Sequence, residues 1–492
     1  MKAPWGRWSC AAIAAVWGVA AFHYATRDLP VGMHLDSPAQ ALAAHDVTFL
    51  DDITGADAYG HGFSSHTLFD AMLRSIANAR SLIVLDCHLC NDLHRNAPDA
   101  LVEPTPMAAQ LIDALLARKA AVPQLQVLVI ADPVNGLYGV APAPELAALQ
   151  AVGIPVVSVD LSALRDRNAL YSSPWRLLLK WWGAAPSGGG WLPNPYSDDG
   201  PPLTVRAWAQ LANLKSSNRR VLLADDGHGG LVALAGTAEP AMASSSDTVT
   251  GLQVSGPAVL PLLHSELELA RSFGWHGSMA LPTTVPDSSD SPKRTDTLEI
   301  QWLGEGAIRN ALLEHIAAAS VGDDIDIASS SLSERAIIGA LLAASRRGVT
   351  VRLILDPHKS ASLWGSANQS VGSELIAASD GQIHVAWYRT HSEQFHAALV
   401  LIHGSGPVWM LSGSASLTRR DLGDYDLVLD AAVSGTAAAA PLMSAQTFFD
   451  TLWNDRGPPG IEYTADADTW ADPSQLRYWA YRLMESLGIS RT

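Results

Sequence analysis

The sequence is poor in positive charge and in charge altogether. Its 492 residues include 32 Lys and Arg against 49 Asp and Glu, a formal net charge of −17, and charged residues make up only 16%. An ordinary soluble domain carries roughly 25% charged residues. So acidic a chain is a poor electrostatic partner for nucleic acid, and we expect no nucleic-acid binding. A local basic pocket is still compatible with these numbers.

Cysteine is also scarce. Cys10, Cys87 and Cys90 are the three cysteines, so a framework of several disulfides is excluded. Cys10 lies in an N-terminal apolar segment, which leaves Cys87 and Cys90 as one pair. We interpret this pair as structural, and an oxidising compartment would allow a local disulfide. A redox or metal site is the alternative, but no second ligand pair accompanies the cysteines, and His88 between them is given no role.

Long apolar runs are absent after the N-terminus. Lys2 and Arg7 precede an apolar run over residues 10–22, an order typical of a signal peptide. A spanning helix normally needs ~20 residues, so the run is short for a permanent anchor. Residues 1–27 are therefore interpreted as either a cleaved signal peptide or a membrane anchor. Both interpretations export the rest of the chain, in a bacterium to the periplasm or the periplasmic face of the inner membrane.

The remaining chain alternates predicted helices and buried strands, and the order occurs twice. Each half gives helix, strand, helix, then a strand that ends in Asp-Pro, at Asp132 and at Asp356. The predicted elements lie at 67–79, 81–86, 107–118 and 127–133 in the first half, and at 306–319, 324–327, 333–346 and 349–357 in the second. This alternation predicts an α/β fold, and its recurrence predicts a duplicated unit.

We expect the first unit at 44–280, a Pro- and Ser-rich linker at 281–296, the second unit at 297–456 and a C-terminal tail at 457–492. The first unit carries an insertion near 172–205 that is rich in Trp, Leu and Gly. A packed helix followed by a loop is the favoured interpretation of this insertion. A membrane-facing or substrate-covering element is the alternative.

Four segments carry a family resemblance. They are THSEQFH at 390–396, GSASLTRRDLGDYDL at 413–427, NLK at 213–215 and VLLADDG at 221–227. Together they resemble bacterial phospholipase D-like and cardiolipin-synthase-like proteins of the phospholipase D superfamily, over most of residues 44–455. The resemblance implies two α/β/α units related by a pseudo-twofold axis, behind the N-terminal apolar helix. In that family each unit carries His-x-Lys-x4-Asp followed by a Gly-Ser-x-Asn turn.

The chemistry implied by the resemblance uses both units at one site. A histidine from one unit attacks phosphorus, and the histidine from the other protonates the leaving alkoxide. The lysines and the turn residues stabilise the charge of the transition state. The resemblance implies no metal and no cofactor.

This chain departs from the family pattern at most of these positions. The first copy has Asn218, Arg220 and Asp225 at the His, Lys and Asp positions, with Thr237 and Glu239 in its turn. The second copy has His396, Ala398 and His403 at the same positions, with Ser414 and Ser416 in its turn. Asn218 cannot act as a nucleophile, Ala398 removes a cation, and Glu239 places a negative charge where phosphate is expected.

The resemblance and these departures together define the expected site. Its catalytic residue is His396, with Glu393 or His391 as proton partner, and its substrate-binding residues are Asn218, Arg220, Asp225, Thr237, Glu239, Ser414 and Ser416. The acids Asp424 and Asp426 are interpreted as solvated charges.

Two functions follow from this site. The favoured one is a phospholipase D-like protein of the cell envelope with impaired phosphodiesterase activity, which binds phosphorylated headgroups at a membrane surface or assists an active paralogue. The alternative is an active phospholipase D or cardiolipin-synthase-like phosphodiesterase or phosphatidyltransferase that acts on phospholipids through His396.

Overall fold

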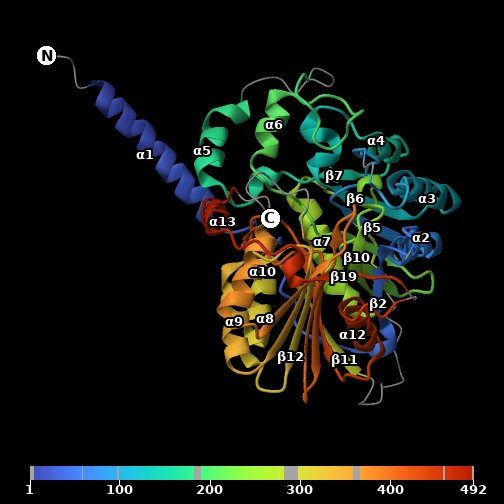
Figure 1. Cartoon of the computed structure of the whole chain (residues 1–492). Helices are drawn as coiled ribbons and strands as arrows, with labels where there is room; N and C mark the ends of the chain where they lie inside the picture. The colour runs from blue at the N-terminus through green and yellow to red at the C-terminus, as the bar shows by residue number, and fades with distance from the viewer. Residues whose placement is uncertain are drawn as a thin grey trace.

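The protein is an α/β molecule built on two large sheets, with an apolar helix projecting from its N-terminal end (Figure 1). The computed structural model describes residues 5–30, 32–57, 59–96, 99–181, 190–281, 297–357, 366–457 and 460–489. The linker predicted at 281–296 lies outside the described residues from residue 282 onward.

The first sheet has eight strands and contains the first motif copy. Its order is β15-β10-β9-β8-β5-β6-β7, and β2 also pairs with β10. The strands are β2 (Val47–Asp52), β5 (Leu82–Cys87), β6 (Gln126–Ala131), β7 (Val156–Ser158), β8 (Val221–Asp225), β9 (Leu231–Gly236), β10 (Thr248–Ser255) and β15 (Phe395–His396). The motif strand β8 is buried along its whole length.

The second sheet has nine strands, in the order β1-β11-β18-β17-β16-β12-β13-β14-β19. The strands are β1 (Gln40–Ala43), β11 (Thr297–Gly304), β12 (Asp324–Ser329), β13 (Thr350–Leu355), β14 (Ile383–Tyr388), β16 (Ala398–His403), β17 (Val408–Gly413), β18 (Leu429–Gly435) and β19 (Thr464–Asp466). The segment after residue 456, expected as a tail, therefore supplies β19 to this sheet.

The two sheets repeat one topology. In the first sheet β5, β6 and β7 are parallel neighbours, and the motif strand β8 lies antiparallel to β5. In the second sheet β12, β13 and β14 are parallel neighbours, and the motif strand β16 lies antiparallel to β12. The duplication predicted from the recurring element order is therefore present.

Two short strands cross between the sheets. β1 lies near the start of the chain, yet it pairs with β11 of the second sheet. β15 carries His396 and lies next to β16 in sequence, yet it pairs with β10 of the first sheet. Each unit therefore completes a sheet edge of the other.

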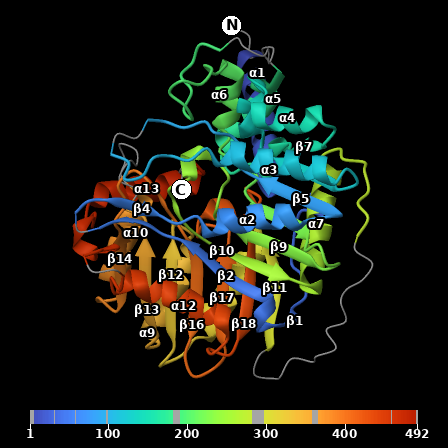
Figure 2. The ribbon, with the colours of Figure 1, turned by 90° about the vertical axis from the view of Figure 1, so that its right-hand side faces the viewer.

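Helices cover the outer faces of both sheets, and a shared core fills the space between them (Figures 1 and 2). The outer helices are α2 (Thr67–Asn78), α3 (Met107–Ala121) and α4 (Pro144–Ala151) on the first sheet, and α8 (Glu305–Ala318), α9 (Arg335–Arg346) and α10 (Ala367–Ala378) on the second. The shared core includes α7 (Leu260–Ser272) and α12 (Ala440–Trp453). Residues of β5 alternate between the shared and the outer core, as strand geometry requires.

The N-terminal helix α1 (Trp5–Thr26) stands away from this body (Figure 1). Its residues Trp8–Thr26 are long and apolar enough to cross a membrane. The insertion predicted near 172–205 begins within α5 (Ala169–Leu177), includes the 3-10 turn η4 (Leu179–Trp181) and ends at the start of α6 (Val205–Leu211). Trp175 of α5 is packed inside, whereas Leu178 and Trp181 are exposed. Residues 182–189 of the insertion lie outside the described residues.

A buried charge cluster joins the two units beneath the motif strands. The Arg219 guanidinium is fully buried and donates to Glu266 Oε1 at 3.0 Å and to the Met33 carbonyl at 2.6 Å. Glu305 begins the first helix of the second unit and accepts from the Val428 N–H at 3.1 Å. Burial raises the pKa of Glu305 to about 8, against the opposing pull of Arg219. Glu305 therefore keeps its proton at neutral pH.

This proton makes stability depend on pH. The unfolded chain releases the Glu305 proton near its ordinary pKa of 4.5, whereas the folded chain holds it to about 8. Between these values the folded state binds more protons, so the free energy of unfolding should fall as pH rises, by up to about 1.4 kcal/mol per pH unit. Urea unfolding of Glu305→Gln from pH 5 to 8 should show a shallower fall than the unmodified chain. Glu299→Gln, at an exposed site on β11, is the control, and equal slopes for both variants would contradict the assignment.

Candidate functional site

The recurring Asp-Pro carboxylates hold the entrances to the two motif segments. Asp132 Oδ2 accepts from the N–H of Ser217 at 2.7 Å, and Asp356 Oδ2 accepts from the N–H of Phe395 at 2.7 Å. Ser217 and Phe395 directly precede Asn218 and His396. The same contact therefore fixes the first position of each motif, although only one of the two motifs keeps its histidine.

A second pair of aspartates crosses between the units, and we call these the exchanged aspartates. Asp247 of the first unit accepts from the N–H of Gln394 at 2.9 Å, and its Oδ2 lies 3.8 Å from Nδ1 of His396. Asp426 of the second unit accepts from the N–H and the hydroxyl of Ser216, at 2.9 and 2.6 Å. Each unit thus holds the motif segment of the other through one carboxylate.

The two motif copies meet at Arg220 and His396. Arg220 Nη1 lies 3.2 Å from Nε2 of His396 and donates to the carbonyl of Thr237 at 3.1 Å. Because arginine can only donate, Nε2 of His396 is the acceptor in this contact. Arg220 Nη2 also forms an ion pair with Glu239 Oε1 at 2.5 Å, and each side chain is only 4% exposed.

Glu239 is the anion at the centre of this cluster. Burial opposes its ionisation, but Arg220, His88 and His396 outweigh burial and lower the pKa of Glu239 below its ordinary value. The carboxylate therefore stays charged at neutral pH and lies beside Arg220, the cation at the lysine position of the first motif.

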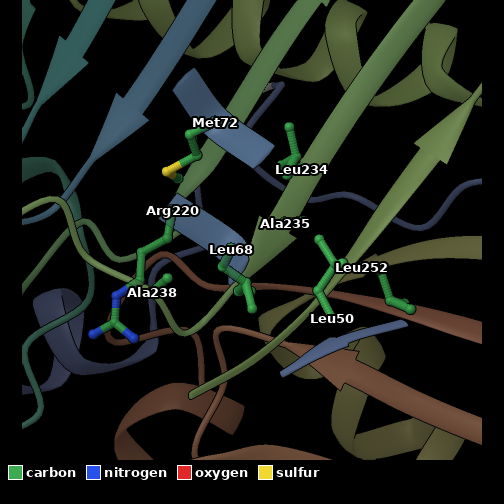
Figure 3. Close-up of a pocket in the computed structure, with 9 residues that line it drawn as sticks. Leu50, Leu68, Met72, Arg220, Leu234, Ala235, Ala238 and Leu252 are labelled. Atoms are coloured by element: carbon green, nitrogen blue, oxygen red, sulfur yellow. The ribbon is translucent and has the colours of Figure 1, made fainter. Parts of the chain in front are cut away.

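Little space is left beside the ion pair. The stem of Arg220 borders a cavity of about 10 Å³, and its guanidinium points away from the apolar walls formed by Leu68, Met72 and Leu252 (Figure 3). A second cavity of about 20 Å³ is lined by Glu239 and Asp247 among others. A single water molecule needs roughly 10–15 Å³ measured in this way. Neither cavity has room for a phosphodiester.

His88 is a member of the site that the sequence did not reveal. Asn135 accepts from the Cys90 N–H at 2.7 Å and donates to the carbonyls of His88 and Asp132, at 2.8 and 3.1 Å. In the second unit Asn368 makes the same three contacts with Leu332, Ser330 and Asp356. His88 therefore holds the place in the first unit that Ser330 holds in the second.

The surroundings of His88 are those of a site residue. Its Nδ1 lies 3.6 Å from Asp132 Oδ2. Burial would lower its pKa, but Asp132 and Glu239 outweigh burial and raise it. Cys87 and Cys90, on either side of His88 in sequence, form a disulfide, as an oxidising compartment would allow. His88 therefore lies beside Asp132 and within the influence of Glu239, which its position in the sequence did not indicate.

Two expected site residues make hydrogen bonds to other parts of the fold. Asp225 accepts from the N–H groups of Arg80, Ser81 and Leu82, so it ties β8 to the start of β5. The hydroxyl of Ser414 is bonded to the backbone of Leu429.

The hydroxyl groups of two further expected site residues also make hydrogen bonds within the fold. Ser416 contacts the hydroxyl of Ser330 at 2.9 Å. Thr237 bonds the backbone of Thr250 through its own hydroxyl. In these contacts neither hydroxyl is bonded to Arg220 or Glu239.

Asn218 is held by the second unit through its backbone. Its N–H donates to the Leu427 carbonyl at 2.7 Å, and the preceding Ser217 pairs with Leu427 in the parallel sense. This contact is the counterpart of the parallel pairing of β15 with β10, which joins the second motif to the first unit. The side-chain oxygen of Asn218 is buried and has no partner among the described residues.

Two acids differ from expectation in their surroundings. The carboxylate of Glu393 accepts from the N–H groups of His391 and Ser392, so it stabilises its own turn, and the carboxylate beside His396 is Asp247 instead. Asp426 was expected to be solvated but is fully buried, because it bonds Ser216 and pairs with Arg420 at 2.8 Å. Within the described ranges, no group of three or more His, Cys, Asp or Glu side chains is placed to hold a metal ion.

Comparison with known families gives a match to the second unit. Residues 312–453 match the model described as the PLD-like domain of cardiolipin synthase. This match, which covers most of the second unit, confirms the resemblance to the phospholipase D superfamily. No curated protein matches the chain.

Among solved structures, the fold is similar to that of phosphatidylserine synthase from Haemophilus influenzae Rd KW20, with a TM-score of 0.51 and 10% identity over 96% of this chain and 100% of that one. At this identity the likeness establishes a shared fold. A polyphosphate kinase from Porphyromonas gingivalis has a TM-score of 0.43 and 12% identity, over 86% of this chain and 51% of that one. A phospholipase D family member from Salmonella typhimurium has a TM-score of 0.24 and 20% identity, over 32% and 92%.

The effects of replacing Arg220 and Glu239 on the free energy of unfolding should be strongly coupled. Removing one partner of a buried pair leaves an uncompensated charge and typically costs about 3–5 kcal/mol. Arg220→Met and Glu239→Gln should therefore each lower the free energy of unfolding by about 3 kcal/mol, and the double variant should lose clearly less than the sum. Urea unfolding of all four proteins measures the coupling. Additive losses would show that the two side chains do not interact in solution.

Proposed function

We propose that this chain is a phospholipase D-like protein of the cell envelope that recognises phosphorylated headgroups without turning them over at an appreciable rate. The observation that carries this proposal is the buried Arg220–Glu239 ion pair, in which the chain's own carboxylate occupies the expected phosphate site. The same arginine faces the atom of His396 that would attack phosphorus.

Three features support impaired catalysis. The position of one family histidine is held by Asn218, and the position of one family lysine by Ala398. Nε2 of His396 has its lone pair directed at Arg220, so it is not free to act as a nucleophile in this arrangement. The two cavities that border Arg220 and Glu239 measure only about 10 and 20 Å³, the space of one or two water molecules.

Headgroup recognition is supported by the kind of groups that surround Glu239. Arg220 pairs with this carboxylate, and His88 and His396 lie close enough to help lower its pKa. Guanidinium groups also bind phosphate through charge-assisted hydrogen bonds. A phosphorylated headgroup would therefore compete with Glu239 for Arg220, and binding would require the carboxylate to move aside.

Replacing Glu239 should open the site. Glu239→Asn removes the charge, shortens the side chain and restores the residue type that the family resemblance expects. Binding of glycerol 1-phosphate to the full chain in detergent, measured by calorimetry, should become at least about tenfold tighter, as expected when a competing charge is removed from a phosphate-binding arginine. The matched control is Glu374→Asn, which breaks the Arg335–Glu374 pair far from the motifs. Thermal unfolding confirms that each variant is folded, and equal affinity in the unmodified chain and Glu239→Asn would contradict the proposal.

A second candidate is an active phosphodiesterase or phosphatidyltransferase, and the placement of His88 favours it. His88 and His396 each have an aspartate near Nδ1, at 3.6 and 3.8 Å. In this scheme His396 Nε2 forms a bond to phosphorus while the bond to the headgroup oxygen breaks, and protonated His88 gives its proton to that oxygen. Water then releases phosphate ester from His396, with His88 accepting the proton.

Turnover of phosphatidylglycerol in mixed micelles separates the two candidates. Under our proposal, mass spectrometry should detect no more phosphatidic acid from the unmodified chain than from His396→Ala. Phosphatidic acid formation that is lost in both His396→Gln and His88→Gln would establish the second candidate, with losses of about 10²–10⁴-fold for a proton-transfer residue. His228→Gln, in an exposed turn, is the control for histidine replacement.

A further inference from the structure

The body of the molecule carries an exposed apolar surface at the end where α1 joins it. Contacts between the last turn of α1 and the body hold the helix there. The carbonyl of Tyr24 accepts from the N–H of Asp166 at 2.8 Å. The Arg176 guanidinium lies 4.2 Å from the centre of the Tyr24 ring and is itself bound to Asp166. Arg27 donates to the carbonyls of Ser162 and Leu164. The last turn of α1 is therefore held by the folded body.

Apolar side chains gather where this helix is held. Leu178, between α5 and η4, is 61% exposed, and Trp181 at the end of η4 is 74% exposed. Lys180, between them, lies 6.0 Å or less from the rings of Trp175 and Trp181. Pairs of tryptophan and lysine at the ends of apolar segments are typical of the membrane–water interface.

The C-terminal helix α13 (Gln475–Leu487) adds a second part of this surface. Leu476, Trp479 and Leu483 are exposed and recur at the three- and four-residue spacing of one helix face. Tyr481 is buried on the other side. A helix with such a face and with arginines beside it has the pattern of helices that lie in a membrane interface.

The two parts are joined beside the base of α1. Arg167, directly before α5, donates to the carbonyl of Gly488 at the end of α13 at 3.0 Å. Arg419 donates to the carbonyl of Glu485 in the same helix at 2.9 Å. Figure 1 shows α1, α5 and α13 converging at one place on the body. We define the basal surface as the exposed apolar side chains that run from α5 through Leu178 to η4, together with those of α13.

We infer that the basal surface rests on a phospholipid bilayer that α1 crosses. A helix long and apolar enough to span a membrane leaves the body beside this surface, so lipid around the helix would reach the same side chains. Lipid is favoured over a protein partner because the surface adjoins the candidate span and combines tryptophan, leucine and cationic side chains. Cleavage after residue 25 would remove the contacts of Tyr24 with Asp166 and Arg176, so these contacts also favour a retained anchor over a cleaved signal peptide.

Site-directed spin labelling of the full chain tests this inference. Starting from Cys10→Ser, which leaves the Cys87–Cys90 disulfide intact, Leu178→Cys and Leu483→Cys each receive a nitroxide. Val321→Cys is the control, since Val321 is also aliphatic and 79% exposed, in the turn between α8 and β12. The labelled proteins are placed in nanodiscs of phosphatidylethanolamine and phosphatidylglycerol, and collisions with oxygen and with a water-soluble nickel chelate are compared.

The ratio of oxygen to nickel collisions should be several-fold higher at positions 178 and 483 than at 321. Equal ratios at the three positions would show that the basal surface lies in water and would overturn the inference. Protection of 178 and 483 from both reagents would show a protein contact, with a second copy of this chain or another partner, and would also overturn it. Circular dichroism checks the fold of each variant. The cluster around Glu239 takes no part in this measurement, so its outcome is independent of the proposed function.

Discussion

The site depends on the exchange of carboxylates between the two units. Asp247 reaches from the first unit to the backbone before His396, and Asp426 reaches from the second unit to the backbone before Asn218. Both are buried, and each replaces water at an N–H group that would otherwise be costly to bury. This reciprocal arrangement fixes the motif segments against each other. It holds even where a motif has lost its histidine, so the geometry of the site is preserved separately from its chemistry.

The fold could be predicted from the sequence because its signals are local and occur twice. Buried strands such as β5 and β6 contain short continuous apolar runs, and the Asp-Pro at each strand end marked the repeat. The site could be predicted only in part. Arg220, Glu239 and His396 lie at motif positions, and they do meet. His88 and Asp247 could not be found in this way, because their approach depends on contacts between segments far apart in the chain. Asp426 looked solvated for the same reason.

The acidic character of the chain extends into the site, where a carboxylate pairs with the site arginine. The chain as a whole is acidic, with a net charge of −17, and some of its buried acids are paired with buried arginines. Arg219 and Arg220 are neighbours in sequence, yet they serve different clusters: Arg219 binds Glu266 between the units, and Arg220 binds Glu239 in the site. The site cation that a ligand would need is thus already neutralised within the fold.

β1 and β15 each pair with a strand that is distant in sequence, and this limits when the two sheets can finish folding. Residues 40–43 are among the first to be synthesised, but their partner β11 begins at residue 297. The edge of β10 likewise waits for residues 395–396. Contacts so distant in sequence close slowly, because the intervening chain must be ordered first. Neither half is thus a self-sufficient module that could be cut out intact, and a growing chain keeps unpaired strand edges until most of its length has emerged.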